Sequence, residues 1–486
     1  MRCIIMVVFI MAAMTALFAE RLRPSDFEYR GAIRLPQPEQ TTGSTWAFNY
    51  VEPAMAYYPG GDPGGSSDGY PGSLYLSGHP YDHYPITEVT IPAPVSSPAK
   101  NVDALPVAQA LRPFTNIIPL GGEPGFDLGV GALTYVRQQG NFTSDKILVN
   151  WTPYWLTWSS PRLSMVDLNL TNVSAPWHCG PDSLNMRTVG YQCVIPQDWA
   201  DQHVGGKNIA VGNPRWGQGS GTWGPNIVAY APWTLNQPVT FNSHVADYKE
   251  LLRYPDTTDR MWHNGFCTAD EWWGLMWPKV GDKSALIISG RNSKGICLYD
   301  NGPYAPDGYN AHFLLYDPDD LAEVAHGTKQ MWEPLPETLD VTSNMYGWEQ
   351  HGLLYTMLFG AAYDSVNQLI YVVEVGGEYP NPLIHVWHIT ATADAEGNEV
   401  AKRAGQLTVQ PNPFNPQTKI TVSMKQAKVN GTIEINIYDS HGKLVQKLTT
   451  DAGEATWDAS GFPSGVYVVS ARYGDMTLTK RAILLK

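Results

Sequence analysis

The sequence predicts an all-β fold: a β-propeller, with five blades preferred, followed by a small antiparallel β-sandwich. Short apolar runs bounded by Gly, Pro and Asn recur along the chain, which is typical of strands joined by tight turns. Gly (45), Pro (38) and Tyr (26) are abundant among the 486 residues, whereas charged residues make up only 16%. That composition favours many turns and aromatic loops over long helices or disorder.

The most regular segment, residues 360–389, predicts three consecutive strands of one blade. Residues 360–363 carry small side chains, residues 369–373 form a continuous apolar run, and residues 383–389 alternate apolar and polar positions. Turn residues separate the three runs, so we expect them to form an antiparallel meander.

Four weaker copies of this pattern precede it. Their irregular spacing leaves six blades, or a β-sandwich with long loops, as alternatives. A short strand within residues 20–45 is expected to close the ring. Helices are expected at 197–203 and 318–326, the second capped by Asp319 or Asp320. The predicted strands of the four copies are 54–58, 73–77 and 86–91; 131–135, 146–150 and 162–168; 189–195, 208–212 and 226–230; and 272–277, 285–289 and 312–316.

Residues 1–19 predict an export signal peptide, with Arg2 before an apolar run and the small residue Ala19 at its end. The run is shorter than the roughly 20 residues that span a bilayer, and no later stretch is long enough, so no transmembrane anchor is expected. The net charge of -14 argues against nucleic acid as a partner, because nucleic acids bind basic surfaces.

Without the signal peptide four cysteines remain: Cys179, Cys193, Cys267 and Cys297. An even number in an exported chain predicts disulfides. Proximity in sequence favours the pairs Cys179–Cys193 and Cys267–Cys297, although four cysteines allow three pairings. A zinc site is the alternative, and the lack of any CxxC pair argues against it.

The composition changes near residue 391. The propeller-like body is assigned to residues 20–390, and residues 391–404 form a polar linker. The tail, residues 405–486, alternates apolar and polar positions cleanly, which predicts a small Ig-like antiparallel β-sandwich. Its predicted strands include 420–422, 433–438 and 465–470.

The tail also carries several short motifs in a fixed order. They are Asn412-Pro413-Phe414-Asn415-Pro416, Tyr438-Asp439 followed by Gly442-Lys443-Leu444-Val445, Pro463-Ser464-Gly465-Val466-Tyr467, and the final residues Lys480 to Lys486. Together these motifs resemble the C-terminal sorting domain (type A) of proteins exported by the type IX secretion system. The resemblance implies entry into the periplasm, passage across the outer membrane by that machinery, and release or attachment at the cell surface.

The body resembles secreted β-propeller proteins of unknown activity. This likeness rests on residues 199–206 and on the segment 360–389. It implies a fold and no activity.

In a propeller, the loops that join the second to the third strand of every blade emerge at one face, and here those loops are aromatic. His79, Asn150, Asn213, Arg291 and Glu374 stand at equivalent positions where the loops begin. Aromatic rings with a few convergent polar groups suit a carbohydrate, whereas the alternative is that the rings form small cores within the loops. The candidate ligand-binding residues are His79, Tyr81, Trp151, Trp155, Trp158, Asn213, Trp216, Trp223, Arg291 and Tyr304.

Candidate catalytic groups are carboxylates, because glycoside hydrolysis needs two carboxyl groups about 5 to 10 Å apart. Nothing in the sequence pairs them, and turn caps or solvated residues are the simpler interpretation. His79 and His83 flank Asp82, but this spacing in a loop is not diagnostic of a metal, so no metal site is predicted. No cofactor is expected, with calcium at the oxygen-rich residues 300–310 as the alternative. The candidate carboxylates are Asp82, Asp270, Glu271, Asp300 and Glu374.

These observations favour a secreted or cell-surface propeller that binds an extracellular ligand such as a polysaccharide, with the type IX machinery as the partner of its tail. A glycosidase- or lyase-like enzyme with carboxylates in a central funnel is one alternative. A structural or adhesive surface protein that binds another protein is the second. The sequence does not decide whether the chain is an enzyme.

Overall fold

The computed structural model describes residues 20–391 except 63, 65–68, 119–127, 154–159, 216–221, 256–264, 296–304, 306 and 353–354, and residues 406–486 except 413, 424–432, 440–442, 452 and 474–475. The chain divides into two compact units, Met1–Ala391 and Thr392–Lys486, and each is considered by itself. The predicted signal peptide lies outside the described residues.

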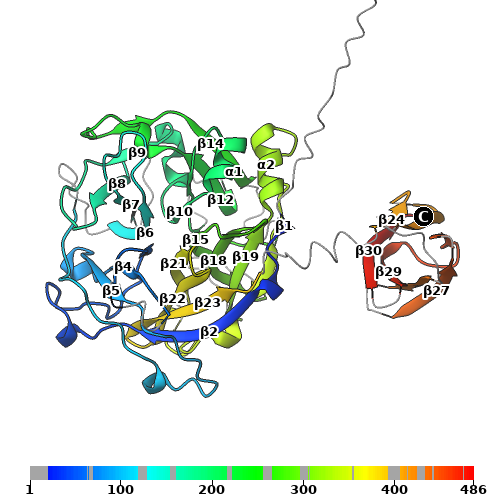
Figure 1. Ribbon diagram of the computed structural model, residues 1–486, viewed down its shortest axis with the longest axis horizontal. Helices are drawn as coiled ribbons and strands as arrows, with labels where there is room; N and C mark the ends of the chain where they lie inside the picture. The colour runs from blue at the N-terminus through cyan, green and yellow to red at the C-terminus, as the bar shows by residue number, and fades with distance from the viewer. Residues whose placement is uncertain are drawn as a thin grey trace, which may run out of the picture. The chain divides into compact units, whose positions relative to one another are not determined.

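The first unit consists of mostly antiparallel sheets that follow one another along the chain, with parallel pairing of β9 with β13 and of β1 with β17 (Figure 1). Within each sheet, neighbouring strands are mostly neighbours in sequence, so each sheet is a meander. The strands are β3 (Met55–Tyr58), β4 (Ser73–Ser77) and β5 (Ile86–Thr90); β6 (Leu128–Val136), β7 (Lys146–Pro153), β8 (Leu163–Asp167) and β9 (Trp177–Cys179), with β13 (Ser243–Val245) added at its edge; β10 (Gln192–Val194), β11 (Ile209–Val211), β12 (Thr222–Tyr230) and β14 (Tyr248–Pro255); β15 (Glu271–Met276), β18 (Leu286–Ser293), β19 (Tyr309–Tyr316) and β20 (Glu337–Asp340); and β21 (Leu358–Asp364), β22 (Leu369–Glu378), β23 (Asn381–Ile389) and β2 (Phe27–Arg34).

Smaller elements complete this unit. Three short strands, β1 (Glu20–Arg21), β17 (Lys283–Ser284) and β16 (Lys279–Val280), form a separate sheet. Beyond β5, isolated bridges join Ile86 to Thr115 and Val89 to Ala110. The 3₁₀ helices are η1 (Pro24–Asp26), η2 (Pro38–Gln40), η4 (Pro80–Asp82), η5 (Val102–Ala104), η6 (Asp182–Arg187), η7 (Pro232–Thr234) and η8 (Thr342–Asn344).

The predicted all-β fold is confirmed, and every predicted strand of the five copies overlaps a strand of the structure. The sequence interpretation missed the outer strands β9, β14 and β20. β14 and β20 lie at sheet edges and carry charged residues, so their apolar pattern is weak, and β9 is only three residues long.

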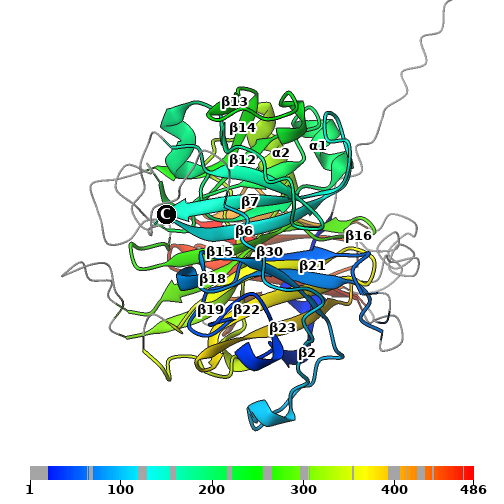
Figure 2. The same ribbon diagram turned by 90° about the vertical axis from the view of Figure 1, so that its left-hand side faces the viewer.

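The first strands of the five sheets, β3, β6, β10, β15 and β21, pack against one another in a closed cycle: β21 on β3, β3 on β6, β6 on β10, β10 on β15, and β15 on β21. Figure 1 shows the labelled members near the middle of the unit, and Figure 2 shows β6, β15 and β21 as neighbouring layers. Glycine permits the close approach. A Cβ atom on Gly131 would lie 2.6 Å from the carbonyl oxygen of Gly190, and one on Gly360 would lie 2.4 Å from that of Pro53.

The strand near the N-terminal end of the described chain completes the last sheet. β2 pairs antiparallel with β23, from Phe27 opposite Ile389 to Arg34 opposite Leu383, with a bulge between Tyr29 and Gly31. This is the closing strand that the sequence predicted within residues 20–45. Buried residues of β2, β3 to β7 and β21 to β23 share one hydrophobic cluster, so the pairing of β2 with β23 also completes a hydrophobic core.

Both predicted helices are present as α1 (Gln197–His203) and α2 (Pro318–His326). The predicted cap of α2 was wrong: the helix begins at Pro318, as expected, and the residue before it, Asp317, is the cap, with its carboxylate accepting a hydrogen bond from the N–H of Asp319 at 3.0 Å. Among the described residues, no helix combines the length and apolar character needed to cross a membrane.

The predicted Cys179–Cys193 disulfide was wrong. Both thiols are free and buried, Cys179 among side chains of β7, β8 and β12 and Cys193 in a cluster with Trp199 and Tyr254. Burial raises the pKa of both thiols well above their usual range, so neither is a reactive thiolate. Cys267 is buried with its sulfur 2.8 Å from the Ser293 hydroxyl, and its proposed partner Cys297 lies outside the described residues.

The second unit has two antiparallel sheets that share one hydrophobic cluster. Motif residues hold it together: the Phe414 and Trp457 rings lie 5.2 Å apart, the N–H of Leu485 donates to the Phe414 carbonyl at 3.0 Å, and the Tyr467 hydroxyl donates to the Pro463 carbonyl at 2.7 Å. The strands are β24 (Gln406–Gln410), β25 (Gln417–Ser423) and β28 (Glu454–Asp458) in one sheet, and β27 (Leu444–Thr450), β26 (Ile433–Tyr438), β29 (Gly465–Tyr473) and β30 (Met476–Leu484) in the other.

We predict that Gly31→Ala destabilises the first unit by on the order of 3 kcal/mol. Gly31 has a φ of 125°, and a Cβ atom there would lie 2.3 Å from the carbonyl carbon of Val95, which is backbone and cannot rotate away. Thermal unfolding measures the effect. Gly129→Ala in β6 is the matched control, because its Cβ atom would have no neighbour closer than 3.6 Å, and it should leave the midpoint nearly unchanged.

Candidate functional site

A strip of aromatic and imidazole rings runs over the loops beside β3, β4, β21 and β22. Its first group is Trp46, His79 and Tyr81, in which the Trp46 and His79 rings stack at 5.1 Å and the His79 and Tyr81 rings lie 4.8 Å apart. Two of these residues, His79 and Tyr81, belong to the loop that the sequence predicted as part of a ligand face.

The second group of the strip surrounds Tyr379, in the loop after β22. The His351 ring stacks on the Tyr379 ring, with centroids 4.4 Å apart. The rings of Tyr355 and Tyr50 meet the Tyr379 ring edge to face, with centroids at 5.2 and 5.6 Å. Residues 46–50 join the two groups, because this turn carries both Trp46 and Tyr50. We call Tyr81, His79, Trp46, Tyr50, Tyr379, Tyr355 and His351 the aromatic strip.

The turn that joins the two groups has an unusual backbone. Ala47 and Tyr50 have φ values of 48° and 55°, in the left-handed region that side chains other than glycine seldom adopt. Hydrogen bonds hold this conformation: the Tyr50 N–H donates to the Pro380 carbonyl at 2.8 Å, and the His79 N–H donates to the Ala47 carbonyl at 3.1 Å. The positions of Trp46 and Tyr50 are therefore fixed by backbone contacts to both neighbouring loops.

The strip is open to solvent although its rings are largely apolar. Tyr81 is 70% exposed, Tyr379 43%, Tyr50 42% and Trp46 37%. A contiguous group of exposed rings is uncommon away from binding sites, since scattered single rings are the norm on a protein surface.

Two carboxyl groups lie beside the second group. Burial raises the pKa of Glu52, which lies three residues before the start of β3, to about 7; a backbone hydrogen bond opposes this rise and the nearby charge of Glu271 adds to it. Burial also raises the pKa of Tyr355, together with the charges of Tyr379, Glu52 and Tyr50. Glu52 is therefore near enough to both Tyr355 and Glu271 for their charges to influence one another.

The pKa of Glu271, the first residue of β15, is shifted in the opposite direction. Burial alone would raise the pKa of its carboxyl group, but the charges of Arg291 and Arg215 and hydrogen bonds from Trp273 and Arg291 hold the pKa below its usual range. The Arg291 guanidinium and the Trp273 indole each donate to the carboxylate at 2.9 Å. Near neutral pH, Glu271 is therefore ionised, whereas Glu52 is divided between its protonated and ionised forms.

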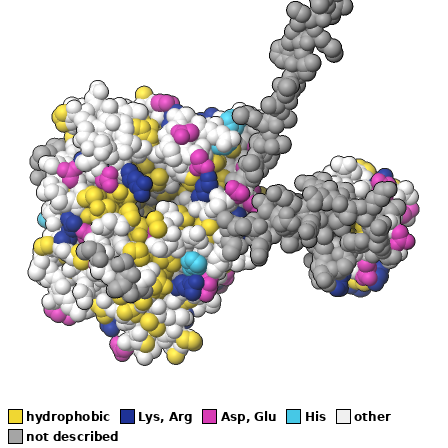
Figure 3. All heavy atoms as spheres, in the orientation of Figure 1, with side chains coloured by type: hydrophobic (Ala, Val, Ile, Leu, Met, Phe, Trp, Pro, Cys, Tyr) yellow, Lys and Arg dark blue, Asp and Glu magenta, His cyan; other side chains and the backbone are white. Residues whose placement is uncertain are grey.

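A cavity of about 560 Å³ lies at the other ends of the first strands. It is lined by the last residues of β3, β6, β10, β15 and β21, including Tyr57, Val136 and Met276, and Figure 3 shows hydrophobic side chains gathered around a hollow near the middle of the unit. Of the described residues that line the cavity, none is Asp or Glu. The carboxyl pair and the cavity thus lie at opposite ends of the same strands.

The polar residues predicted at the ends of the second strands are all buried and bind loop backbone. The Asn150 amide donates to the Thr188 carbonyl at 3.0 Å and accepts from the Gly190 N–H at 3.1 Å. The Asn213 amide donates to the Met186 carbonyl at 3.0 Å. Both side chains hold the segment that enters β10.

Arg291 and Glu374 act in the same way on the segment that enters β21. The Arg291 guanidinium donates to the Thr356 carbonyl at 3.1 Å. The Glu374 carboxylate accepts from the N–H groups of Tyr346 and Gly347, each at 2.8 Å, and from His385 Nε2 at 2.8 Å. Residues at equivalent positions in the sheets therefore make equivalent contacts, each of which supports a loop backbone.

The other candidate residues are dispersed. Asp82 accepts hydrogen bonds from the Ser44 hydroxyl and from the N–H groups of Thr45 and Trp46, so it anchors the start of the turn. Asp270 accepts from Ser293, Cys267 and Asn292, and burial raises its pKa to about 6. Trp151 is buried, and its indole donates to the Ser164 hydroxyl at 2.8 Å.

Several candidates cannot be placed. The side chains of Trp155, Trp158, Trp216, Trp223, Asp300 and Tyr304 lie outside the described residues, as do residues 300–304 and 306 of the segment named as the calcium alternative.

The sequence interpretation missed Trp46, Tyr50, Glu52, His351 and Tyr355. A signal was present in residues 46–52, where Trp46, Phe48 and Tyr50 alternate directly before Glu52. The alternation resembles a strand pattern, and only the structure shows that two of the three rings face solvent while Phe48 is buried.

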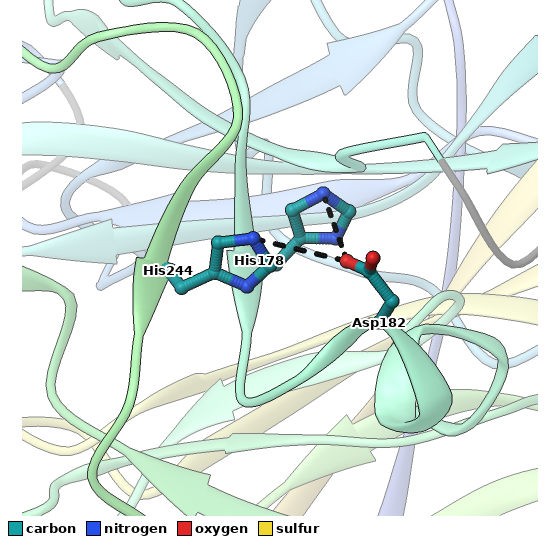
Figure 4. A group of neighbouring side chains, drawn as sticks. All are labelled: His178, Asp182 and His244. Carbon is teal, nitrogen blue, oxygen red and sulfur yellow. Dashed lines mark ion pairs between the residues drawn. The ribbon is translucent and has the colours of Figure 1, made fainter.

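Metal ligands converge at one other place in the described part of the chain. His178, Asp182 and His244 offer ligand atoms that all lie within 4.8 Å of one another (Figure 4). At His79, which the sequence analysis considered and did not predict as a metal ligand, Nδ1 accepts a hydrogen bond from the N–H of Tyr81.

Comparison with known proteins identifies the second unit. Residues 408–485 match the family model of the secretion system C-terminal sorting domain. The chain is therefore an exported protein with a C-terminal sorting domain. More particularly, it carries the sorting domain of the type IX secretion system, which directs it to the cell surface or to secretion.

The chain as a whole has more distant likenesses. PorZ, a surface component of the type IX secretion system of Porphyromonas gingivalis, is 13% identical, with 92% of this chain and 53% of PorZ covered and a TM-score of 0.30. The extracellular domain of a hybrid two-component system protein of B. thetaiotaomicron is 10% identical, with 88% and 44% covered and a TM-score of 0.22. The chain spans about half the length of these structures, and no curated protein matches it.

We predict that Glu52→Gln stabilises the protein at pH 8 and has little effect at pH 5. A carboxyl group whose folded pKa is raised binds a proton more tightly in the folded state, so it weakens stability increasingly as the pH rises from its unfolded pKa toward about 7. Each pKa unit is worth about 1.4 kcal/mol at most. Unfolding midpoints at both pH values measure the difference.

The exposed residue Glu39 supplies the control for this measurement. Glu39→Gln should shift the midpoint equally at pH 5 and pH 8. An equal shift for Glu52→Gln as well would contradict the interpretation of Glu52.

Proposed function

We propose that the first unit is a five-bladed β-propeller that binds an extracellular carbohydrate through the aromatic strip. The closed cycle of first strands, the meander order of each sheet, and the completion of the last sheet by β2 support five blades. The second unit then corresponds to a β-sandwich, and the two domains to residues 20–390 and 405–486.

The exposure of the strip is the observation that supports carbohydrate as the class of ligand. Sugar rings present an apolar face to aromatic side chains and hydroxyl groups at their edges. Tyr50, Tyr81 and Tyr379 expose both ring surface and, in the phenol, a polar group. Glu52 interacts electrostatically with Tyr355 of the strip and with Glu271, so these carboxyl groups can serve as polar partners for the hydroxyl groups of a sugar.

A second candidate function is glycoside hydrolysis, and the carboxyl pair favours it. A glycosidase needs one protonated carboxyl group as general acid and one carboxylate as base or nucleophile. Glu52, with its pKa of about 7, suits the first role, and Glu271, stabilised as an anion by Arg291, suits the second. This hypothesis replaces the dispersed carboxylates of the sequence interpretation with one pair.

We predict that Tyr379→Ala and Tyr50→Ala each weaken retention on the polysaccharide that the parent protein binds, by roughly 5- to 10-fold. Each change removes one ring of a stack without altering the buried sheets. A panel of insoluble polysaccharides in a pull-down assay identifies the ligand and measures retention. Trp332→Ala is the matched control, because Trp332 is 42% exposed and lies outside the strip, and it should bind like the parent.

The same assay separates the alternatives. New reducing ends that form with the parent protein and disappear in both Glu52→Gln and Glu271→Gln would establish hydrolysis, whereas retention without new reducing ends would establish binding alone. If the parent is retained on no polysaccharide, the carbohydrate proposal fails. The structural or adhesive alternative, with a protein partner, would then be the one to test.

A further inference from the structure

Two neighbouring histidines lie at the edge of the sheet that contains β6 to β9, separate from the elements that form the aromatic strip. His178 is on β9 and His244 on β13, and these parallel strands pair in the register His244 opposite His178. The two rings therefore stack, with centroids 4.5 Å apart and planes at 12°. Figure 4 shows both rings facing the carboxylate of Asp182, at the start of η6.

The local backbone directs Asp182 toward the rings. Gly180 has a φ of 70°, which lets the chain reverse between β9 and η6, and its N–H donates to the Val245 carbonyl on β13 at 2.9 Å. A Cβ atom on Gly180 would lie 2.7 Å from a methyl carbon of Leu184. The reversal therefore needs a glycine, and it brings residue 182 back beside residue 178.

The partners of the two Nδ1 atoms determine which nitrogen of each ring carries a proton. His244 Nδ1 lies 2.9 Å from the Gly180 carbonyl oxygen, which can only accept. His178 Nδ1 lies 3.3 Å from Asn185 Oδ1, and the Asn185 amide nitrogen donates to the Ser160 carbonyl at 2.6 Å, which fixes the amide orientation. Both Nδ1 atoms are therefore donors, and a neutral ring keeps its lone pair on Nε2.

Both Nε2 atoms point toward further electron-pair donors. Asp182 Oδ1 lies 3.8 Å from His178 Nε2 and 3.7 Å from His244 Nε2. Asn242 Oδ1 lies 2.8 Å from His178 Nε2. Asp182 Oδ1 is thus too far from both rings for a hydrogen bond, and the ligand atoms of His178, Asp182 and His244 lie within 4.8 Å of one another, as ligands around a cation would. The hydrogen bond between Asn242 and His178 Nε2 is one that a bound metal would displace.

We propose that His178, Asp182 and His244 form a binding site for a divalent transition metal, with Zn²⁺ as the best fit. Two imidazoles and a carboxylate are a nitrogen and oxygen set that suits Zn²⁺ better than Ca²⁺ or Mg²⁺, and water can complete the coordination. Ligand atoms of a tetrahedral zinc site lie about 3.4 Å apart, so the two histidine-to-aspartate distances need to shorten only slightly.

The surroundings match those of known metal sites. Histidine ligands usually donate their other ring N–H to a carbonyl or carboxylate, as both do here. His178 is fully buried, while the side chains of His244 and Asp182 are 36% and 62% exposed, so a metal can enter from solvent. A bound metal would tie η6 to β9 and β13, and η6 leads into the segment that Asn150 and Asn213 support.

The test uses the purified full-length chain and zinc chloride as the probe. Isothermal titration and metal analysis after dialysis should give one Zn²⁺ per chain, with a rise in the unfolding midpoint on zinc addition. His244→Ala and Asp182→Asn alter partly exposed side chains, so both variants should fold, and each should weaken zinc binding about tenfold or more.

His326→Ala is the matched control. His326 lies 2.9 Å from His203 on the helices, so this second histidine pair is the competing surface site. Its loss should leave zinc binding unchanged. The proposal is overturned if the parent binds no zinc at about 100 μM, a concentration well above typical protein affinities for this ion, or if His244→Ala and Asp182→Asn bind it as tightly as the parent.

Discussion

Closure of the last sheet by β2 is the constraint on which the first unit depends. The pairing joins residues near the start of the described chain to β23, more than 350 positions later, and the Tyr29 hydroxyl donates to His385 Nδ1 at 2.9 Å. His385 Nε2 donates in turn to the Glu374 carboxylate on β22. Contacts over such separations stabilise only when the intervening sheets are in place, so the N-terminal strand reports on the folding of the whole unit.

The buried polar residues show how a loop-rich fold keeps its loops in position. Asn150, Asn213, Arg291 and Glu374 satisfy backbone groups of the segments that enter β10 and β21, which would otherwise be buried without partners. Because these residues stand at equivalent positions, the sequence interpretation placed them on one ligand-binding face. The same regularity follows from a repeated structural need, because each sheet must fix the segment that leads into a first strand.

The sequence predicted the strands well because burial on both faces leaves apolar runs, as in residues 369–373, and turn residues separate those runs. It predicted the tail from motifs that now prove to be contact points, such as Phe414 and Tyr467. Glu52 and Glu271, or His178 and His244, meet only through the three-dimensional arrangement of distant segments. No spacing rule relates such residues, and the disulfide prediction failed for the same reason, since nearness in sequence did not bring Cys179 to Cys193.

The two buried thiols have a consequence for the order of events during export. An unfolded chain in an oxidising compartment would expose Cys179 and Cys193 to oxidants and to mispairing, whereas the folded chain hides both sulfurs within separate clusters. For these two residues, early packing of β9 and β10 into their sheets therefore protects the thiols from oxidation.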